Sequence, residues 1–128
     1  YGTIIIYTNF IYMNLTQEEL NEQLSTNQQL FTELWEAGDN HEISREIYHN
    51  IIFTSLKDKD DYKDFALREW FQLEHDFFDE EDEIYDLEIM QLTAIIPDKM
   101  NQITLRLASE AKNYNGLYDG WYTSIETL

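Results

Sequence analysis

Residues 43–55, ISREIYHNIIFTS, set the fold class of this chain because apolar and polar side chains alternate along them. The apolar side of the segment carries Ile43, Ile47, Ile51 and Phe53, and the polar side carries Ser44, Glu46, Tyr48 and Asn50. Successive side chains of a strand point to opposite faces, so this period of two predicts a β-strand with one buried face. His49 falls on the apolar side, where a histidine is far more often a hydrogen-bonded core residue than a metal ligand.

A helical pattern precedes this strand. Thr16 and Glu19 have the spacing of a capping box, and Gly38 supplies a left-handed stop. The apolar stripe between these signals consists of Leu20, Leu24, Phe31, Leu34 and Trp35, interrupted by Asn27. These residues predict a helix that begins after Thr16 and ends near Ala37, with the stripe facing the core.

A second helical pattern follows the strand. Residues 58–61 contain three Asp, which favour a helix start because a carboxylate accepts hydrogen bonds from the free amides of the first turn. An aromatic stripe at helical spacing comes next, made of Tyr62, Phe65, Ala66, Trp70, Leu73 and Phe77. We therefore expect the helix to continue to Phe77 and the stripe to be part of the core.

The second half of the chain adds strands and a third helix. Residues 84–96 are apolar on both sides for part of their length, which predicts a central strand of the sheet. A short strand around Phe77, Phe78 or Ile84 could pair with it as a hairpin, but the acidic residues beside these positions disfavour one. Residues 97–114 predict a third helix, opened by a proline and an aspartate, and residues 117–126 predict a closing strand.

This order of elements predicts an α+β fold, with helices on one face of a mostly antiparallel sheet. A ferredoxin-like βαββαβ sandwich with an additional N-terminal helix fits it best. We expect a single domain over residues 13–128. Residues 1–12 are predicted to be an extra edge strand or an N-terminal appendage, the latter lying upstream of a natural start at Met13. Their apolar run is too short and interrupted to span a bilayer, and it lacks the features of a secretory signal.

The composition is strongly acidic. The 128 residues include 26 Asp and Glu but 8 Lys and Arg, which gives a formal charge of -18. The basic residues are dispersed, so the sequence disfavours nucleic acid as a direct ligand, because phosphate binding needs a basic face. With no cysteine, disulfides and thiolate-based metal sites are excluded, which fits a cytoplasmic location.

The acidic residues concentrate in residues 74–88, EHDFFDEEDEIYDLE, where nine of fifteen positions are carboxylates and none is basic. Five consecutive acids repel one another and resist burial, so this segment is either a solvated turn or a surface for a cationic partner. The candidate partner-binding residues are Asp79, Glu80, Glu81, Asp82, Glu83 and Asp86. Phe77, Phe78 and Tyr85 are candidate apolar anchors beside them, although burial in the core is the simpler interpretation of these rings.

No catalytic signature is present. The sequence has no Gly-rich phosphate loop, no HExxH motif and no Ser/His/Asp arrangement. Glycoside hydrolysis needs two carboxylates at a defined separation in a cleft, which consecutive acids on a loop do not supply. A calcium loop is disfavoured because Ile84 stands where such a loop requires glycine. Neither His41 nor His75 has a partner at metal-ligand spacing, so we predict no enzyme, no cofactor and no metal.

Two further motifs resemble those of a known protein family. One is YDGW, formed by Tyr118, Asp119, Gly120 and Trp121 on the predicted closing strand. The other is the opening pattern NLTQEELNEQLSTNQQLFTELWEAG of residues 14–38. With them, residues 13–126 resemble the bacterial regulator of ribonuclease activity B family, small acidic proteins that bind ribonuclease E and damp its cleavage of RNA. The resemblance implies a ferredoxin-like fold, a non-catalytic inhibitor acting on the scaffold region of the nuclease, and YDGW as a marker of the fold.

The chain also departs from that family. Its acids lie in the middle of the sequence instead of mostly in a C-terminal tail, residues 1–12 have no counterpart, and Tyr122 stands where a small residue is expected. The leading hypothesis is a non-catalytic protein that binds a basic surface of a ribonuclease and lowers RNA cleavage. The alternative is an immunity protein or antitoxin that neutralises a basic nuclease toxin, because the same acidity serves both. Neither hypothesis involves a membrane.

Overall fold

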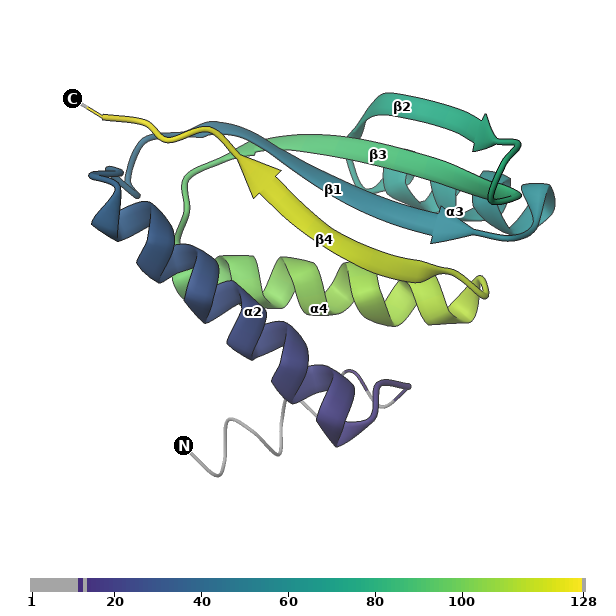
Figure 1. The fold of residues 1–128 in the computed structure, drawn as a ribbon, viewed down its shortest axis with the longest axis horizontal. Helices are drawn as coiled ribbons and strands as arrows, with labels where there is room; N and C mark the ends of the chain where they lie inside the picture. The colour runs from purple at the N-terminus through teal and green to yellow at the C-terminus, as the bar shows by residue number, and fades with distance from the viewer. Residues whose placement is uncertain (1–11, 13, 128) are drawn as a thin grey trace.

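The computed structural model describes residues 12 and 14–127. In chain order its elements are α2 (Gln17–Glu36), β1 (Arg45–Phe53), α3 (Leu56–Arg68), β2 (Gln72–Asp79), β3 (Ile84–Thr93), α4 (Pro97–Asn113) and β4 (Leu117–Thr123) (Figure 1). The predicted α+β class is confirmed. The predicted edge strand or appendage over residues 1–12 lies, apart from Tyr12, outside the described residues.

The four strands form one antiparallel sheet in the order β2-β3-β1-β4. β3 is paired on both sides, as its two-sided apolar pattern predicts, although it ends at Thr93 and not at Ile96. β1 is the other central strand, and its side chains alternate between buried and more exposed positions along its whole length. The two central strands, β1 and β3, therefore contribute most of the sheet's buried side chains.

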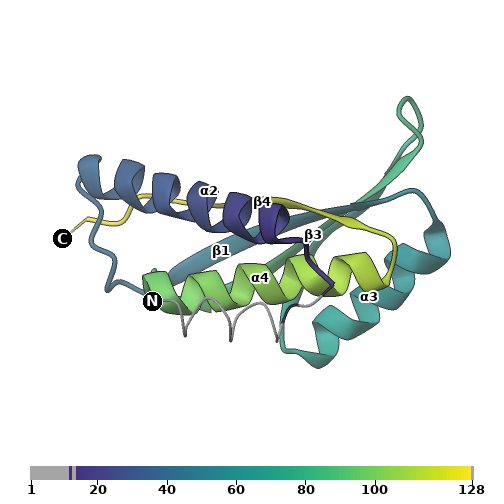
Figure 2. The same ribbon diagram turned by 90° about the horizontal axis from the view of Figure 1, so that it is seen from below.

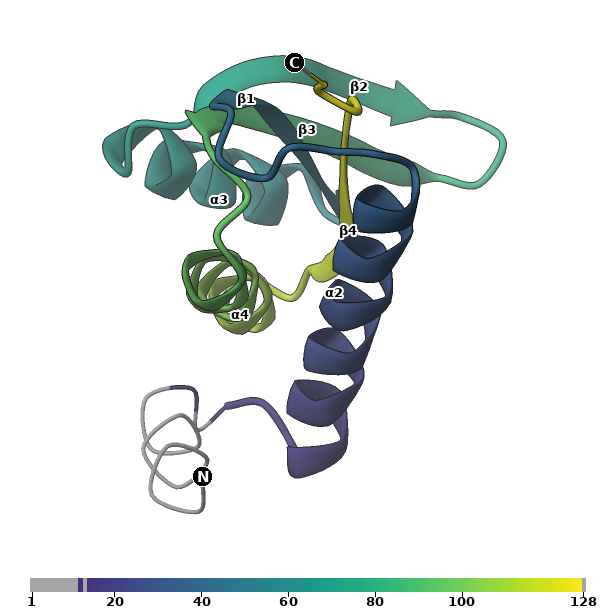
Figure 3. The same ribbon diagram turned by 90° about the vertical axis from the view of Figure 1, so that its left-hand side faces the viewer.

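All three helices pack on one face of the sheet (Figure 3). A larger core cluster forms around Ile51, Tyr62 and Leu107, and a smaller one joins Phe31 of α2 to Ile47 and Trp121. Within the described part of the chain, no helix covers the opposite face, which we call the open face. Side chains directly opposite each other on neighbouring strands share a face, so the strand register assigns each residue to one face or the other.

The N-terminal helix begins as predicted. Thr16 caps α2, its hydroxyl accepts a hydrogen bond from the amide of Glu19 at 3.0 Å, and the Glu19 carboxylate accepts one from the Thr16 amide at 2.9 Å. The prediction for Trp35 is wrong, because its side chain is 69% exposed at the last turn. Asn27, which interrupts the apolar stripe, is instead fully buried.

The predicted helix through Phe77 is wrong. α3 begins earlier than expected, with Ser55 as its cap, and it ends at Arg68. Trp70 has a left-handed backbone with φ of 70°, and the amide of Phe71 bonds to the carbonyl of Ala66 at 3.1 Å, which is a Schellman stop without glycine. The chain then enters β2, so Trp70 is 91% exposed and Phe77 is 56% exposed.

Candidate functional site

The five consecutive acids lie at the β2–β3 hairpin, which extends beyond the rest of the domain (Figure 2). Asp79 ends β2 and residues 80–83 form the turn. One carboxylate oxygen of Asp79 accepts hydrogen bonds from the amides of Glu81 at 3.0 Å and Asp82 at 3.3 Å. An aspartate that bonds the backbone two residues on stabilises a tight turn, so the sequence folds locally into a loop that presents its acids to solvent.

The turn acids are not neutralised within the protein. Glu80, Glu81, Asp82 and Glu83 are exposed, and no ion pair of the described residues includes any residue of 79–83. Two lysines of α3, Lys59 and Lys63, bind a different carboxylate, that of Asp76 on β2, at 2.7 and 2.8 Å. The hairpin therefore carries an uncompensated negative charge at its tip.

The structure separates Asp86 from the turn. Asp86 lies on β3, where it is opposite Ile52 on one side and Phe77 on the other. Its carboxylate accepts a hydrogen bond from the side-chain amide of Asn50. Asp86 therefore belongs to the open face, two positions along the strand from Glu88.

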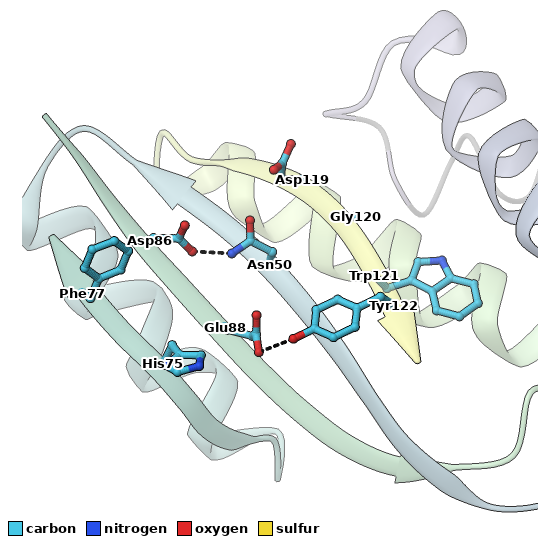
Figure 4. A pocket seen from close by; sticks show the side chains of 9 residues that line it. All are labelled: Asn50, His75, Phe77, Asp86, Glu88, Asp119, Gly120, Trp121 and Tyr122. Atoms are coloured by element: carbon cyan, nitrogen blue, oxygen red, sulfur yellow. Dashed lines mark hydrogen bonds between the residues drawn. The ribbon is translucent and has the colours of Figure 1, made fainter. Parts of the chain in front are cut away.

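The open face contains a depression of about 610 Å³, which we call the open-face depression (Figure 4). The residues that line it are Asn50, His75, Phe77, Asp86, Glu88, Asp119, Gly120, Trp121 and Tyr122. Three of these are carboxylates, Phe77 and Tyr122 offer aromatic rings, and none is Lys or Arg. The strand register brings together residues of all four strands that are far apart in the sequence.

Tyr122 lines the depression, and Tyr48 stacks against it. The ring of Tyr122 stacks on that of Tyr48, with centroids 5.0 Å apart, and its hydroxyl donates a hydrogen bond to Glu88 at 2.6 Å. This hydrogen bond, with burial and the charge of Glu88, raises the pKa of Tyr122 to about 12. Burial and the neighbouring Glu46 carboxylate also raise the pKa of Tyr48. Both phenols thus remain neutral hydrogen-bond donors beside the carboxylates at physiological pH.

The YDGW motif is divided between the two faces. Tyr118 and Trp121 both point into the core, although a separation of three residues normally places side chains on opposite faces. The pairing of β1 with β4 is irregular here: Asn50 is opposite Gly120 and Ile51 is opposite Tyr118, so Asp119 is an extra residue, as in a β-bulge. Gly120 permits this bulge because its backbone has a φ of 117°. Gly120 consequently lies at the open-face depression, with Asp119 beside it.

Buried hydrogen bonds fix the inward half of the motif. The hydroxyl of Tyr118 is 2.7 Å from Nδ1 of His49, whose Nε2 is 2.9 Å from Gln91. Burial lowers the pKa of His49 to about 4, so its ring is neutral at pH 7. The prediction that His49 is a hydrogen-bonded core residue is confirmed.

The buried asparagine connects the N-terminal helix to the rest of the core. The Asn27 carbonyl accepts a hydrogen bond from the indole N–H of Trp121 at 2.8 Å. Its amide donates to Thr104 at 2.8 Å and to Asn101 at 2.9 Å, both on α4. Asn27 therefore joins α2, α4 and β4 at one point.

The three candidate anchors, Phe77, Phe78 and Tyr85, are not all buried in the core as the simpler interpretation of the sequence predicts. Phe77 is exposed at the depression, and Phe78 is 42% exposed while its ring packs against Tyr85 at 4.6 Å. Core burial is thus the wrong interpretation for Phe77 and Phe78, and Tyr85 is half-buried against the main core cluster. Sequence reasoning also missed Glu88, Asn50 and Tyr122. The alternation of acids with buried residues along β3 is the signal that could have identified Glu88 as outward-facing.

The described residues contain no group of three or more His, Asp or Glu side chains that could hold a metal ion. His41 is paired with Asp39 at 2.6 Å, while His75 lies at the open-face depression. None of the helices in the described part of the chain has the length and apolar character needed to cross a membrane.

Fold and site together define a small acidic α+β domain whose exposed functional groups are carboxylates and aromatic rings. A comparison with family models gives a match over residues 24–123 to the family described as regulator of ribonuclease activity B (RraB). The chain belongs to this family, as the resemblance in its sequence predicts. No individual curated protein matches it.

Proposed function

We propose that this protein is a non-catalytic regulator that binds an endoribonuclease of the ribonuclease E type and lowers its cleavage of RNA. The observation that carries the proposal is the uncompensated charge of residues 79–83 at the end of a projecting hairpin. The family name supports the regulatory role, since it describes regulators of ribonuclease activity. That match gives no support to the alternative of an immunity protein.

Electrostatics explains how such a hairpin would find its partner. Protein segments that bind RNA are basic because they neutralise phosphates, so a ribonuclease and its scaffold offer positive surfaces. Exposed carboxylates attract such a surface over roughly 8 Å at physiological salt, and they increase the rate of encounter more than they increase affinity. Affinity needs apolar contacts at the centre of the interface, for which Phe77 and Phe78 are the exposed rings beside the acids.

The binding residues we propose are Asp79, Glu80, Glu81, Asp82, Glu83 and Asp86. The first five would act at the tip of the hairpin and Asp86 on the open face. Regulation would follow from occupation of a basic surface and would require no reaction. A cytoplasmic location, a basic partner surface and the absence of direct nucleic-acid binding belong to the same proposal.

The ferredoxin-like assignment is also our inference. After α2, the elements follow the order β-α-β-β-α-β, and the strand order β2-β3-β1-β4 places the first and third of these strands at the centre. This arrangement supports a βαββαβ sandwich to which α2 has been added at the N-terminus.

The test is neutralisation of the hairpin tip without loss of its geometry. In the variant D79N/E80Q/E81Q/D82N/E83Q, the side-chain amide that replaces the Asp79 carboxylate keeps an oxygen to accept the turn amides. We expect weaker binding to ribonuclease E, a shallower dependence of affinity on salt, and less inhibition of RNA cleavage. Binding is measured by titration at several salt concentrations, and inhibition by the cleavage rate of a labelled RNA.

A matched control removes the same number of charges elsewhere. The residues Glu18, Glu22, Glu36, Glu42 and Asp64 are all exposed. Their replacement by Gln and Asn changes the net charge equally and leaves the hairpin intact. Equal affinity and equal inhibition for the hairpin variant, the control and the natural sequence would refute the proposed function.

A further inference from the structure

The open-face depression has features that the hairpin tip lacks. Asp86, Glu88 and Asp119 surround a hollow bordered by the rings of Phe77 and Tyr122 (Figure 4). The tip is a solvated turn, whereas a hollow partly excludes water from the group that enters it. An ion pair is stronger where water is partly excluded, provided that hydrogen bonds compensate the charges.

β4 contributes a glycine to the lining of this hollow. Gly120 lies opposite Asn50 across the β1–β4 pair, and a Cβ atom added to it would meet no atom within 4 Å. Any side chain at residue 120 would project into this open space. The YDGW motif therefore shapes the depression with its two middle residues, while its outer two residues hold β4 to the core.

The carboxylates of the depression have acceptor capacity left. Asp86 accepts one hydrogen bond, from Asn50, and Glu88 accepts one, from Tyr122, each through a single oxygen. No hydrogen bond among the described residues reaches the second oxygen of either group or the Asp119 side chain. A carboxylate with a free oxygen and a fixed orientation is well placed to bind an incoming cation.

Among the residues that the structure describes, no Lys or Arg lines this depression. Arg45, on β1, is buried on the side of the sheet that the helices cover, which we call the covered side. There it binds Asp39 and the carbonyls of Asn40 and Ser124. Lys59 and Lys63 bind Asp76, and Arg106 binds Glu69. Within the described chain, the open-face depression thus combines carboxylates with no Lys or Arg at its lining.

We propose that the open-face depression receives an arginine side chain from an extended basic segment of the ribonuclease. A guanidinium group can bind a carboxylate through two N–H groups and stack on an aromatic ring at once, which matches Glu88 and Asp86 beside Tyr122 and Phe77. In an extended segment every second side chain faces the same way, so neighbouring basic residues can reach Glu46 and Asp119. This inference rests on the proposed function and names the partner chemistry for it.

The two acidic regions then have different tasks. The hairpin tip attracts either Arg or Lys, because exposed charges act as point charges. The depression favours Arg, because a planar guanidinium can stack on a ring while it binds a carboxylate through two N–H groups, whereas an ammonium binds as a point charge. The tip should govern the rate of association and the depression the rate of dissociation.

The experiment uses two fluorescein-labelled peptides of equal charge, one alternating Arg with Gly and the other alternating Lys with Gly. Their binding to the full chain is followed by fluorescence anisotropy. We expect the natural protein to prefer the Arg peptide severalfold. E88Q and D86N should each weaken Arg-peptide binding by about tenfold, since each removes one charge-assisted hydrogen bond. Gln and Asn still accept the hydrogen bonds from Tyr122 and Asn50, so the depression keeps its shape.

Two controls separate this inference from the proposed function. D64N removes one exposed charge on α3 and should leave the preference for Arg unchanged. The neutralised hairpin variant should weaken both peptides equally. If E88Q and D86N leave the affinity and the preference for Arg unchanged while the hairpin variant loses ribonuclease binding, the inference is overturned and the proposed function stands. If the hairpin variant binds and inhibits ribonuclease E as well as its matched control and the natural sequence do, the proposed function itself fails.

Discussion

The two sides of the sheet use the same kinds of residues in opposite ways. On the covered side, His49, Tyr118 and Asn27 are buried and each polar group is hydrogen-bonded. On the open face, Asn50, Glu88 and Tyr122 also form hydrogen bonds, but they border a depression that is open to solvent. The covered side therefore determines stability, and the open face is available for binding.

This difference shows how a domain of this size can carry a large excess of negative charge. Buried polar groups are costly only when they lack partners, and no buried side-chain polar atom of the described chain lacks one. Carboxylates that remain in water need no partner and repel one another only moderately. Most of the acidic excess can accordingly lie on the surface, while the buried charges of Arg45 and Asp39 are paired with each other.

The largest test compares one asparagine on each side. Asn27→Ala should lower the free energy of unfolding by about 4 kcal/mol, because it leaves the Trp121 indole without its acceptor, removes a hydrogen bond to Thr104 and opens a cavity. Asn50→Ala, which removes a half-buried side chain on the open face, should cost about 1 kcal/mol. Urea denaturation measures both. Equal losses would contradict the division between a stabilising side and a binding side.

A second test uses pH and the buried histidine. The pKa of His49 falls from 6.5 to about 4 on folding, so the unfolded chain binds more protons between these values. Stability should therefore rise with pH across this window. The contribution of His49 is fully present above pH 6.5 and is lost as the pH falls to 4, a total of about 3 kcal/mol.

Carboxylates titrate in the same range, so the effect must be isolated by difference. His49→Gln removes the titrating group and leaves the carboxylates unchanged. The free energy of unfolding of this variant should vary less steeply between pH 4 and 6.5 than that of the natural protein. Parallel curves for the two proteins would show that His49 does not become neutral on folding.

The sequence predicted the covered side more completely than the open face. Period two in residues 43–55 and the capping box at Thr16 both depend on local geometry, which a single segment expresses by itself. The end of α3 could not be predicted in this way. Trp70, Leu73 and Phe77 have helical spacing, yet a Schellman stop without glycine interrupts them, and hydrogen bonding to β3 makes residues 72–79 a strand.

The candidate site shows the same limit. The acidic turn is contiguous in the sequence, so its exposure followed from charge repulsion, but its place in a β2–β3 hairpin instead of after a helix did not. The open-face depression combines residues of four strands, and their contact depends on the strand order and on an irregularity near Gly120. Neither feature is expressed by one segment. YDGW was visible as a motif, but its division between two faces required the register of β4 against β1.

The smallest effect concerns a single hydrogen bond on the open face. Glu88 holds the pKa of Tyr122 at about 12, chiefly through the hydrogen bond and with the help of its charge. Glu88→Gln keeps an acceptor but removes the charge, so the pKa of Tyr122 should fall, while the remaining hydrogen bond and burial keep it above its ordinary value. The pKa of Tyr122 is measured from the absorbance of tyrosinate during an alkaline titration. The variant Tyr122→Phe shows which transition belongs to Tyr122, because that transition disappears. Because Tyr122 is half exposed, the free energy of unfolding at neutral pH should change by less than about 1 kcal/mol. A larger loss of unfolding free energy would mean that the open face also stabilises the fold. Its residues could then not change to suit a different partner without a cost in stability.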